Sequence, residues 1–333
     1  MKTIFLLLII ITNSTFAQKE RYKKTEKNTL EGTKFGMLDV KENKQIIPNI
    51  YSQIGDYTIG KFVAVLNKKA GLIDSLNTVI IPFQYTTISD FFEDRIFLTQ
   101  NQKCAMANEK GTILTKFEFD EILGYEDGIV RISKNNKIGY LDKSGKTIIQ
   151  PQFNEAYDCS GNFILAYTSS WKSLDYTYVQ KDYYGNVINT KDIGMSGKLP
   201  IIFNKKGIII YKGQFDEKIL GITPNKKLII SDRYLQLGTR ESKIIDSNGK
   251  IVYQLKSQNS PTIEKEWIKI ISETGVGIID FDGKILLKPN FKQITDYSFR
   301  NNELAKVKFN NDDFFYIDKN AKCVEFENKT CPE

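Results

Sequence analysis

The sequence has 333 residues, of which 41% are hydrophobic, and its 47 Lys and Arg against 40 Asp and Glu give a formal net charge of +7. It has no histidine, which excludes the Ser/His/Asp and Cys/His catalytic triads. Its four cysteines form no CxxC pair, so we expect no zinc site. The basic residues are scattered among acidic ones, so we expect no nucleic-acid partner.

The first 17 residues have the features of a secretory signal peptide. Lys2 precedes an apolar run at 4–11, and the small residues Thr15 and Ala17 follow it in a pattern typical of a cleavage site. This run is too short to cross a bilayer core, which needs about 20 residues. We expect cleavage after Ala17, which leaves an exported bacterial protein, periplasmic or secreted, with no membrane span.

One phrase recurs along the rest of the chain. Residues 139–153 read GYLDKSGKTIIQPQF, and residues 277–291 read GIIDFDGKILLKPNF. Weaker copies start at Gly36, Gly71 and Ala105, which lie 34 or 35 residues apart. The series continues at Gly207 and in the segments 178–188, 243–253 and 315–326. This spacing predicts a single repeat domain over residues 18–333, with about nine repeats between residues 28 and 326.

Each repeat reads as a set of short strands, and no segment has the 3.6-residue period of a helix. In the copy around residue 139, an apolar strand at 128–133 leads through a polar corner into a second strand. A turn at 142–145 follows, rich in residues that favour turns. A third strand then ends at Pro151, because proline cannot donate to a ladder, and a short aromatic piece closes the repeat. The fold class is therefore all-β, built from tandem repeats of β-hairpins.

Such a repeat cannot bury its own apolar face, so its neighbours must cover it. A propeller-like ring, a strongly curved toroid and an open β-solenoid all achieve this. Nine short repeats without obvious polar caps favour the ring or toroid over the solenoid.

The order Gly, two apolar residues, Asp, a turn, Lys, aliphatic residues, Pro and an aromatic resembles the WG-repeat family, whose repeat centres on a Trp-Gly pair. The resemblance covers residues 28–326, and its best copies are at 71–91, 139–153 and 277–297. It implies β-hairpin repeats and a role in binding, with no shared catalytic residues.

The family tryptophan is missing from every copy. Its slot holds Phe35, Ala70, Cys104, Ile138 and Val276, and the two tryptophans, Trp171 and Trp267, lie elsewhere. If that tryptophan packs between neighbouring repeats, each substitution removes a contact of about 150–250 Å². We therefore expect a less regular array than the family norm.

One acid recurs at the turn of most repeats: Asp39, Asp74, Asp142, Asp246, Asp280 and Asp318. Calcium needs about 6–8 converging oxygens, which one acid per repeat does not supply. We therefore interpret these acids as turn residues and expect no metal and no cofactor. Three acid pairs at expected loop tips leave a carboxylate-based glycoside hydrolase open without favouring it: Glu93 with Asp94, Glu126 with Asp127, and Asp312 with Asp313.

The four cysteines have different expected roles. Cys323 and Cys331 are close in sequence, so in an exported chain we expect them to form a disulfide. Cys104 is expected to be a small buried hydrophobe. Cys159 is either a free thiol or a partner of a terminal cysteine.

The stretch 168–200 breaks the repeat spacing and is rich in aromatic and small polar residues. Insertions in repeat arrays map to loops on one face, which is often the binding face. If the chain has a ligand-binding loop, we expect it here, with the candidate contacts Trp171, Tyr176, Tyr178, Tyr183 and Tyr184. The alternative is that this stretch is an eroded repeat. The predicted function is that of an exported, monomeric, non-catalytic scaffold for a protein or cell-envelope partner, with a glycan-binding module and the hydrolase as alternatives.

Overall fold

The computed structural model describes residues 21–181, 187–235, 239–257, 259–295 and 304–332. For residues 170–181, 187–196 and 234 only the backbone is described. The chain divides into an N-terminal half, residues 1–152, and a C-terminal half, residues 153–333. The predicted signal peptide, 1–17, lies outside the described residues. Within them, no helix has the length and apolar character needed to cross a membrane.

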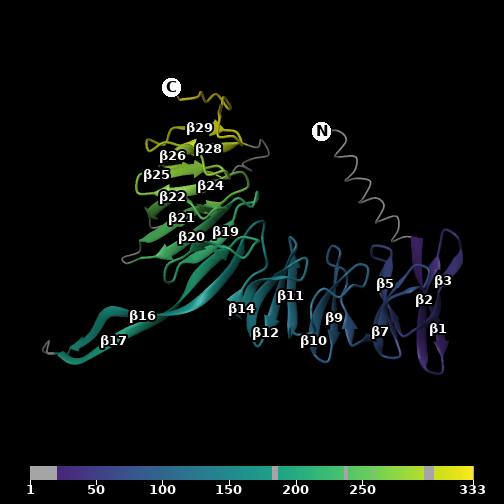
Figure 1. Cartoon of the computed structure of the whole chain (residues 1–333). Coiled ribbons are helices and arrows are strands. Elements are labelled where there is room, and N and C mark those ends of the chain that lie inside the picture. The colour runs from purple at the N-terminus through teal and green to yellow at the C-terminus, as the bar shows by residue number, and fades with distance from the viewer. Residues whose placement is uncertain (1–20, 182–186, 236–238, 258, 296–303, 333) are drawn as a thin grey trace. The chain divides into compact units, whose positions relative to one another are not determined.

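The prediction of an all-β fold is confirmed, and each half is a series of antiparallel sheets (Figure 1). The N-terminal half has four. Their strands in order are β1 (Tyr22–Thr29), β2 (Gly32–Asp39) and β3 (Lys44–Tyr51); β4 (Gln53–Ile54), β5 (Lys61–Leu66), β6 (Lys69–Asp74) and β7 (Val79–Tyr85); β8 (Thr87–Ile88), β9 (Arg95–Gln100) and β10 (Lys103–Asn108); and β11 (Glu121–Glu126), β12 (Ile129–Lys134), β13 (Lys137–Asp142) and β14 (Thr147–Phe153).

The described residues of the C-terminal half also form four sheets, each with four strands. They are β15 (Glu155–Ala156), β16 (Ile164–Lys181), β17 (Val187–Phe203) and β18 (Ile209–Lys212); β19 (Lys218–Ile222), β20 (Leu228–Tyr234), β21 (Arg240–Asp246) and β22 (Ile251–Ser257); β23 (Thr262–Ile263), β24 (Ile268–Ser272), β25 (Gly275–Ile279) and β26 (Ile285–Phe291); and β27 (Gln293–Ile294), β28 (Ala305–Lys308), β29 (Phe314–Ile317) and β30 (Cys323–Val324).

The core of each half lies between successive sheets. In the N-terminal half, Met37 and Ile47 of the first sheet pack with Phe62 and Ile73 of the second. Two further clusters join the second sheet to the third and the third to the fourth. Three clusters join the four sheets of the C-terminal half in the same way, and Trp267 is fully buried in the last of them. Neighbouring repeats therefore cover each other's apolar faces, as the sequence predicts.

The recurring acid is a turn residue in the six repeats that have it, and Asn108 and Asn204 take its place in the other two. The Asp142 carboxylate accepts bonds from the backbone N–H groups of Ser144 and Lys146, at 2.8 and 3.1 Å. Asn204 makes the same pair of contacts with Lys206 and Ile208. Such side chains mimic a backbone turn and fix the hairpin between two strands. The interpretation as turn residues is confirmed.

Two details of the predicted repeat are wrong. The short aromatic piece opens the next sheet instead of closing its own: β8, from the segment after Tyr85, pairs with β9. The third strand also does not end at proline. It continues to Phe153 beyond Pro151, because β14 is the edge strand of its sheet and its unpaired side requires no N–H donor.

The glycine of the repeat is explained by this edge strand. A Cβ atom at Gly36, Gly139 or Gly277 would lie 2.3–2.7 Å from a carbonyl oxygen of the edge strand, next to its proline. At Gly71 the obstacle is the Phe83 ring, at 2.6 Å. All four repeats with this glycine have the edge-strand proline: Pro48, Pro82, Pro151 and Pro289. The other four repeats lack both and place Ala105, Ile201, Lys243 and Phe315 at the position three residues before the turn acid.

The structure has eight sheets within its described residues, where the sequence predicts about nine repeats. The segment 178–188 is no separate repeat, because its described residues belong to the paired strands β16 and β17. Gly207 also occupies a different position of the repeat from the predicted one. Its N–H donates to the Asn204 carbonyl and its φ is 75°, so it corresponds to the turn glycine Gly145, whose φ is 89°, and not to Gly139. The C-terminal copies are therefore offset by one long insertion.

Candidate functional site

The predicted binding loop at 168–200 is a β-hairpin. Strands β16 and β17 pair from Ile164 with Phe203 to Lys181 with Val187 (Figure 1). The neighbouring strands β15 and β18 pair only near the base, from Tyr167 and Ile201 inward. The rest is a two-stranded ribbon, which is marginally stable on its own in water.

The predicted contact residues lie on this hairpin. Trp171, Tyr176 and Tyr178 are in β16, where only the backbone is described. Tyr183 and Tyr184 lie outside the described residues. The five side chains therefore stay a prediction.

A different site is visible in the N-terminal half. A cavity of about 480 Å³ lies between the third and fourth sheets. One wall is formed by residues 87–89, in and just after β8, together with Phe92, Phe97 and Thr99. The other is formed by residues 121–125 of β11, and Cys104 of β10 also lines the space. We call this space the aromatic pocket.

Three rings give the aromatic pocket its apolar wall. The ring centroids of Phe92 and Phe97 are 5.7 Å apart, and both lie 6.3–6.4 Å from that of Tyr125. Phe92 is 43% exposed, so its ring is open to an incoming group. Burial raises the pKa of Tyr125, and its hydrogen bond to Glu93 adds to this effect. Tyr125 is therefore a neutral donor that holds the Glu93 carboxylate at 3.0 Å beside the rings.

The pocket lies at a slot where the family tryptophan is missing. Cys104 occupies that slot, and its thiol lies 3.6 Å from the Thr99 hydroxyl and 3.8 Å from the Asp120 carbonyl oxygen. Phe35 occupies the same slot two repeats earlier and lines a second cavity, of about 340 Å³. The predicted irregularity therefore takes the form of open spaces between sheets.

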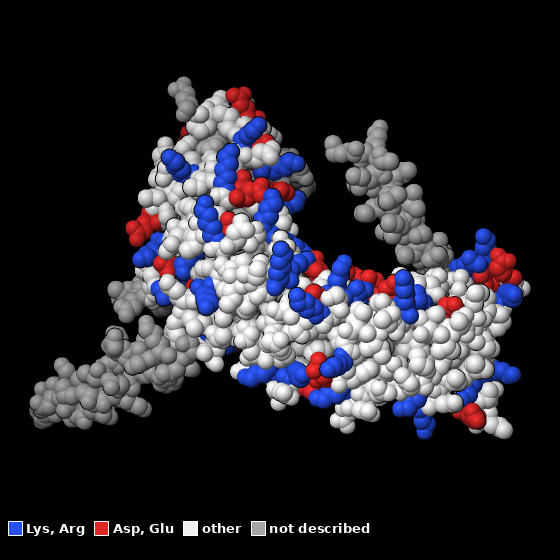
Figure 2. Space-filling model, viewed as in Figure 1, with Lys and Arg blue, Asp and Glu red and all other residues white. Residues whose placement is uncertain are grey.

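Some of the charged side chains around the aromatic pocket form ion pairs, and others do not. Lys103 forms an ion pair with Asp120, and Arg95 forms one with Asp94. Glu93 and Glu121 form no ion pair within the described residues. On the face shown in Figure 2, Lys and Arg are interspersed with Asp and Glu on both halves, without a stripe of one sign.

Sequence reasoning missed this site. Phe92 stands beside Phe91 in an aromatic pair of the kind expected to pack within the sheets. The stronger signal is Cys104, a small residue at the position where the family has a tryptophan. It predicts lost contacts, but whether the neighbouring sheets close over the gap depends on their packing.

A buried charged network lies in the C-terminal half. Glu217 is 1% exposed and Lys243 5%, and their charged groups are 3.4 Å apart. The Glu217 carboxylate also accepts bonds from the Tyr211 and Ser231 hydroxyls and the Gln214 N–H, at 2.6–2.7 Å. Burial would raise the pKa of Glu217, but these bonds and the Lys243 charge outweigh it and hold the pKa below its ordinary value. Glu217 is thus an anion, fully bonded and enclosed.

The predicted acid pairs are surface groups. Asp312 and Asp313 form ion pairs with Lys292 and Lys329. The ion pairs, through the hydrogen bonds they include, lower the pKa of both acids. No group of three His, Cys, Asp or Glu within the described residues is arranged to hold a metal ion.

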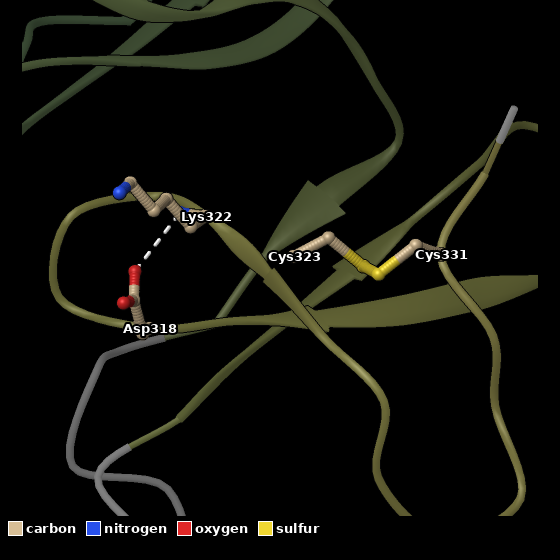
Figure 3. The surroundings of a disulfide bond; sticks show 4 residues. All are labelled: Asp318, Lys322, Cys323 and Cys331. Carbon is tan, nitrogen blue, oxygen red and sulfur yellow. Dashed lines mark hydrogen bonds between the residues drawn. A yellow bond between two sulfur atoms is a disulfide. The ribbon is translucent and has the colours of Figure 1, made fainter.

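The cysteines differ in disulfide pairing and in burial. Cys323 and Cys331 form a disulfide with a Cα–Cα distance of 5.7 Å, next to the turn in which Asp318 accepts from the Lys322 N–H (Figure 3). This bond attaches the C-terminal segment to strand β30. Cys159 is buried and forms no disulfide, and its thiol lies 3.5 Å from the Gly161 carbonyl oxygen.

Comparison with known proteins identifies the repeats. The family described as "WG containing repeat" matches residues 71–104, 106–137, 138–167 and 277–311. The three best copies seen in the sequence, 71–91, 139–153 and 277–297, fall within these matches, so the resemblance is confirmed. No curated protein matches the chain.

Solved structures give weaker similarities. A crystal structure titled as "the eukaryotic initiation factor" is 8% identical, with 91% of this chain and 83% of that chain covered and a TM-score of 0.34. TolB from Acinetobacter baumannii is 14% identical, with 80% and 78% covered and a TM-score of 0.23. PorZ, a surface component of the type-IX secretion system of Porphyromonas gingivalis, is 12% identical, with 87% and 44% covered and a TM-score of 0.25. These scores are too low to assign a fold or a function.

Proposed function

Four repeats of this chain match the WG-containing repeat family, and from that premise we propose that the chain is an exported, non-catalytic scaffold that binds a protein partner in the bacterial cell envelope. The observation that carries the proposal is the aromatic pocket. It is concave, mostly apolar and bordered by a few polar groups, which is the usual composition of a binding site. An open apolar space between two sheets costs stability, which a bound partner offsets.

The test is a cross-linking pull-down from the envelope fraction, with residues 18–333 as bait. The pocket variant is Phe92→Ser. Its matched control is Ile113→Ser, because Ile113 is equally exposed, at 43%, and lies in the same half away from the pocket. We expect one protein to be captured by the wild type and by Ile113→Ser and to be lost from Phe92→Ser. The natural protein isolated from that fraction should begin at Gln18.

Other outcomes would overturn the proposal as stated. Recovery of polysaccharide alone would favour the glycan-binding alternative. Loss of the partner from a Tyr183→Ala, Tyr184→Ala variant, with full binding by Phe92→Ser, would move the site to the hairpin. Recovery of the chain in the cytosol with residues 1–17 attached would exclude export.

We also propose that the sheets form a propeller-like ring or a strongly curved toroid in a monomeric chain. The support is that the successive sheets of each half cover each other's faces. Small-angle scattering of residues 18–333 should then give the mass of one chain and a radius of gyration close to the roughly 20 Å of a compact chain of this length. A rod-like scattering profile would favour the open solenoid.

A further inference from the structure

We propose that the aromatic pocket is one end of a groove that binds an extended polypeptide segment, which adds as a strand to the open edge of β11 and inserts one apolar side chain between the rings. This inference rests on the proposed function and names the chemistry of the partner. Three independent features of the N-terminal half support it: the edge of β11, the vacated tryptophan slot and the unpaired carboxylates.

The first feature is the edge of β11. Five consecutive residues, 121–125, line the cavity. A β-bulge between Ile122 and Gly124 interrupts the regular alternation of side chains here, and the cavity follows the strand along all five residues. β11 is the first strand of its sheet and pairs with β12 on one side only, and no strand within the described residues pairs with its other edge.

The length of β11 sets it apart from the first strands of the two preceding sheets, whereas β1 and β19 open their sheets with eight and five residues. The strands in the same position of the two preceding sheets, β4 and β8, have two residues each, whereas β11 has six. Short edge strands are one way in which proteins avoid pairing with other chains. β11 lacks protection by short length, and its edge carries a single bulge, between Ile122 and Gly124, where an apolar cavity lies beside it. Strand addition at such an edge is a common mode of peptide recognition.

The second feature is the vacated slot. Cys104 leaves the space that a larger residue at this position would fill, and the rings of Phe92, Phe97 and Tyr125 remain around it. An added strand points every second side chain to one face. One aromatic or branched aliphatic side chain of the segment therefore takes the place of the missing tryptophan.

The third feature is charge. Glu93 and Glu121 lie at the pocket without an ion pair in the described structure, although the chain as a whole has a net charge of +7. A carboxylate at the edge of an interface attracts a cation and excludes a like charge. The bound segment should therefore have a Lys or Arg close to its apolar anchor.

The probe is a phage-displayed library of random 12-residue peptides, panned on residues 18–333. We expect selected peptides with an apolar anchor two residues from a Lys or Arg. Cys104→Trp, which fills the slot, should weaken their binding at least about tenfold, and Cys104→Ser, which leaves the slot open, should change it less than about threefold. Circular dichroism establishes that both variants are folded.

A second measurement uses the wild-type chain alone and separates strand addition from simple side-chain insertion. One edge of the selected peptide must pair with β11. N-methylation of alternate amides along that edge should abolish binding, whereas methylation along the opposite edge should not. Amide exchange of residues 121–125 should slow when the peptide is bound. Equal effects of both methylation patterns, or unchanged exchange at β11, would overturn the inference.

The outcomes also separate this inference from the proposed function. If the partner from the pull-down is lost from Phe92→Ser but binds Cys104→Trp as well as the wild type, strand capture fails and the scaffold function stands. If no envelope protein is captured while the selected peptides behave as expected, the groove is a peptide site and the proposed partner class fails. Selection of no peptide, with binding of an oligosaccharide that Cys104→Trp blocks, would overturn the inference.

Discussion

Replacing Lys243 by Met is expected to lower the free energy of unfolding of the C-terminal half by about 3–5 kcal/mol, because it leaves the Glu217 carboxylate charged and enclosed without its cation. Urea unfolding of residues 18–333 measures this. Trp267 is buried among the last sheets and reports on the C-terminal half, and a Trp171→Phe background removes the other tryptophan signal.

Two control variants test whether the loss of stability comes from the buried ion pair. Lys227→Met removes a surface cation whose ion pair with Asp282 is about two-thirds exposed on both sides, so it should cost less than about 1 kcal/mol. Glu217→Leu combined with Lys243→Met replaces the pair by apolar groups and should recover much of the loss. If Lys243→Met unfolds at the same urea concentration as Lys227→Met, the buried pair is not a stabilising element.

The same network sets a pH dependence. The pKa of Glu217 is lower in the folded chain than its ordinary value of 4.5, so its contribution to stability is fully present above pH 4.5 and is lost as the pH falls through the folded pKa. Glu217→Gln should remove this acid-dependent part of the unfolding free energy. An identical decline in wild type and variant below pH 4.5 would assign it to other carboxylates.

The repeat architecture was predictable because its determinants are local. The acid at each hairpin turn, such as Asp142, bonds to amides within four residues, so its pattern survives in the sequence. The boundaries between sheets were not predictable in the same way. The segment after Tyr85 is equally near in sequence to the second and third sheets, and only the pairing of β8 with β9 assigns it to the third.

The sites depend on packing between repeats, which leaves little local trace. Lys243 follows three polar residues in β21 and resembles any solvated lysine in the sequence, yet it is enclosed opposite Glu217. It occupies the slot that holds glycine in other repeats. That slot accepts a long side chain here because β22 lacks the proline found on the edge strands beside Gly36, Gly71, Gly139 and Gly277.

Replacing Gly139 by Ala is therefore the second large effect that we expect, a loss of about 3 kcal/mol, near the upper end for overpacking. The new Cβ would lie 2.6–2.7 Å from the Pro151 nitrogen and the Ile149 carbonyl oxygen. Both are backbone atoms of β14, so relief requires the edge strand to move as a unit. Urea unfolding of the N-terminal half, followed by amide exchange in β14, measures the loss.

The matched control is Ala105→Gly, in the repeat that lacks the edge-strand proline. The segment 113–119 lies beside β10 here but pairs with it only through isolated bridges, at Cys104 with Phe119 and at Ala107 with Ile113. Ala105 is fully buried, so the change should cost about 0.5–1 kcal/mol of added chain freedom and about 0.8 kcal/mol for the lost methyl group. If the repeat glycine served only backbone flexibility, Gly139→Ala would stabilise the chain by a similar amount. A large loss of stability at residue 139 with a small one at residue 105 would show that the glycine is required because the edge strand with its proline packs directly against it.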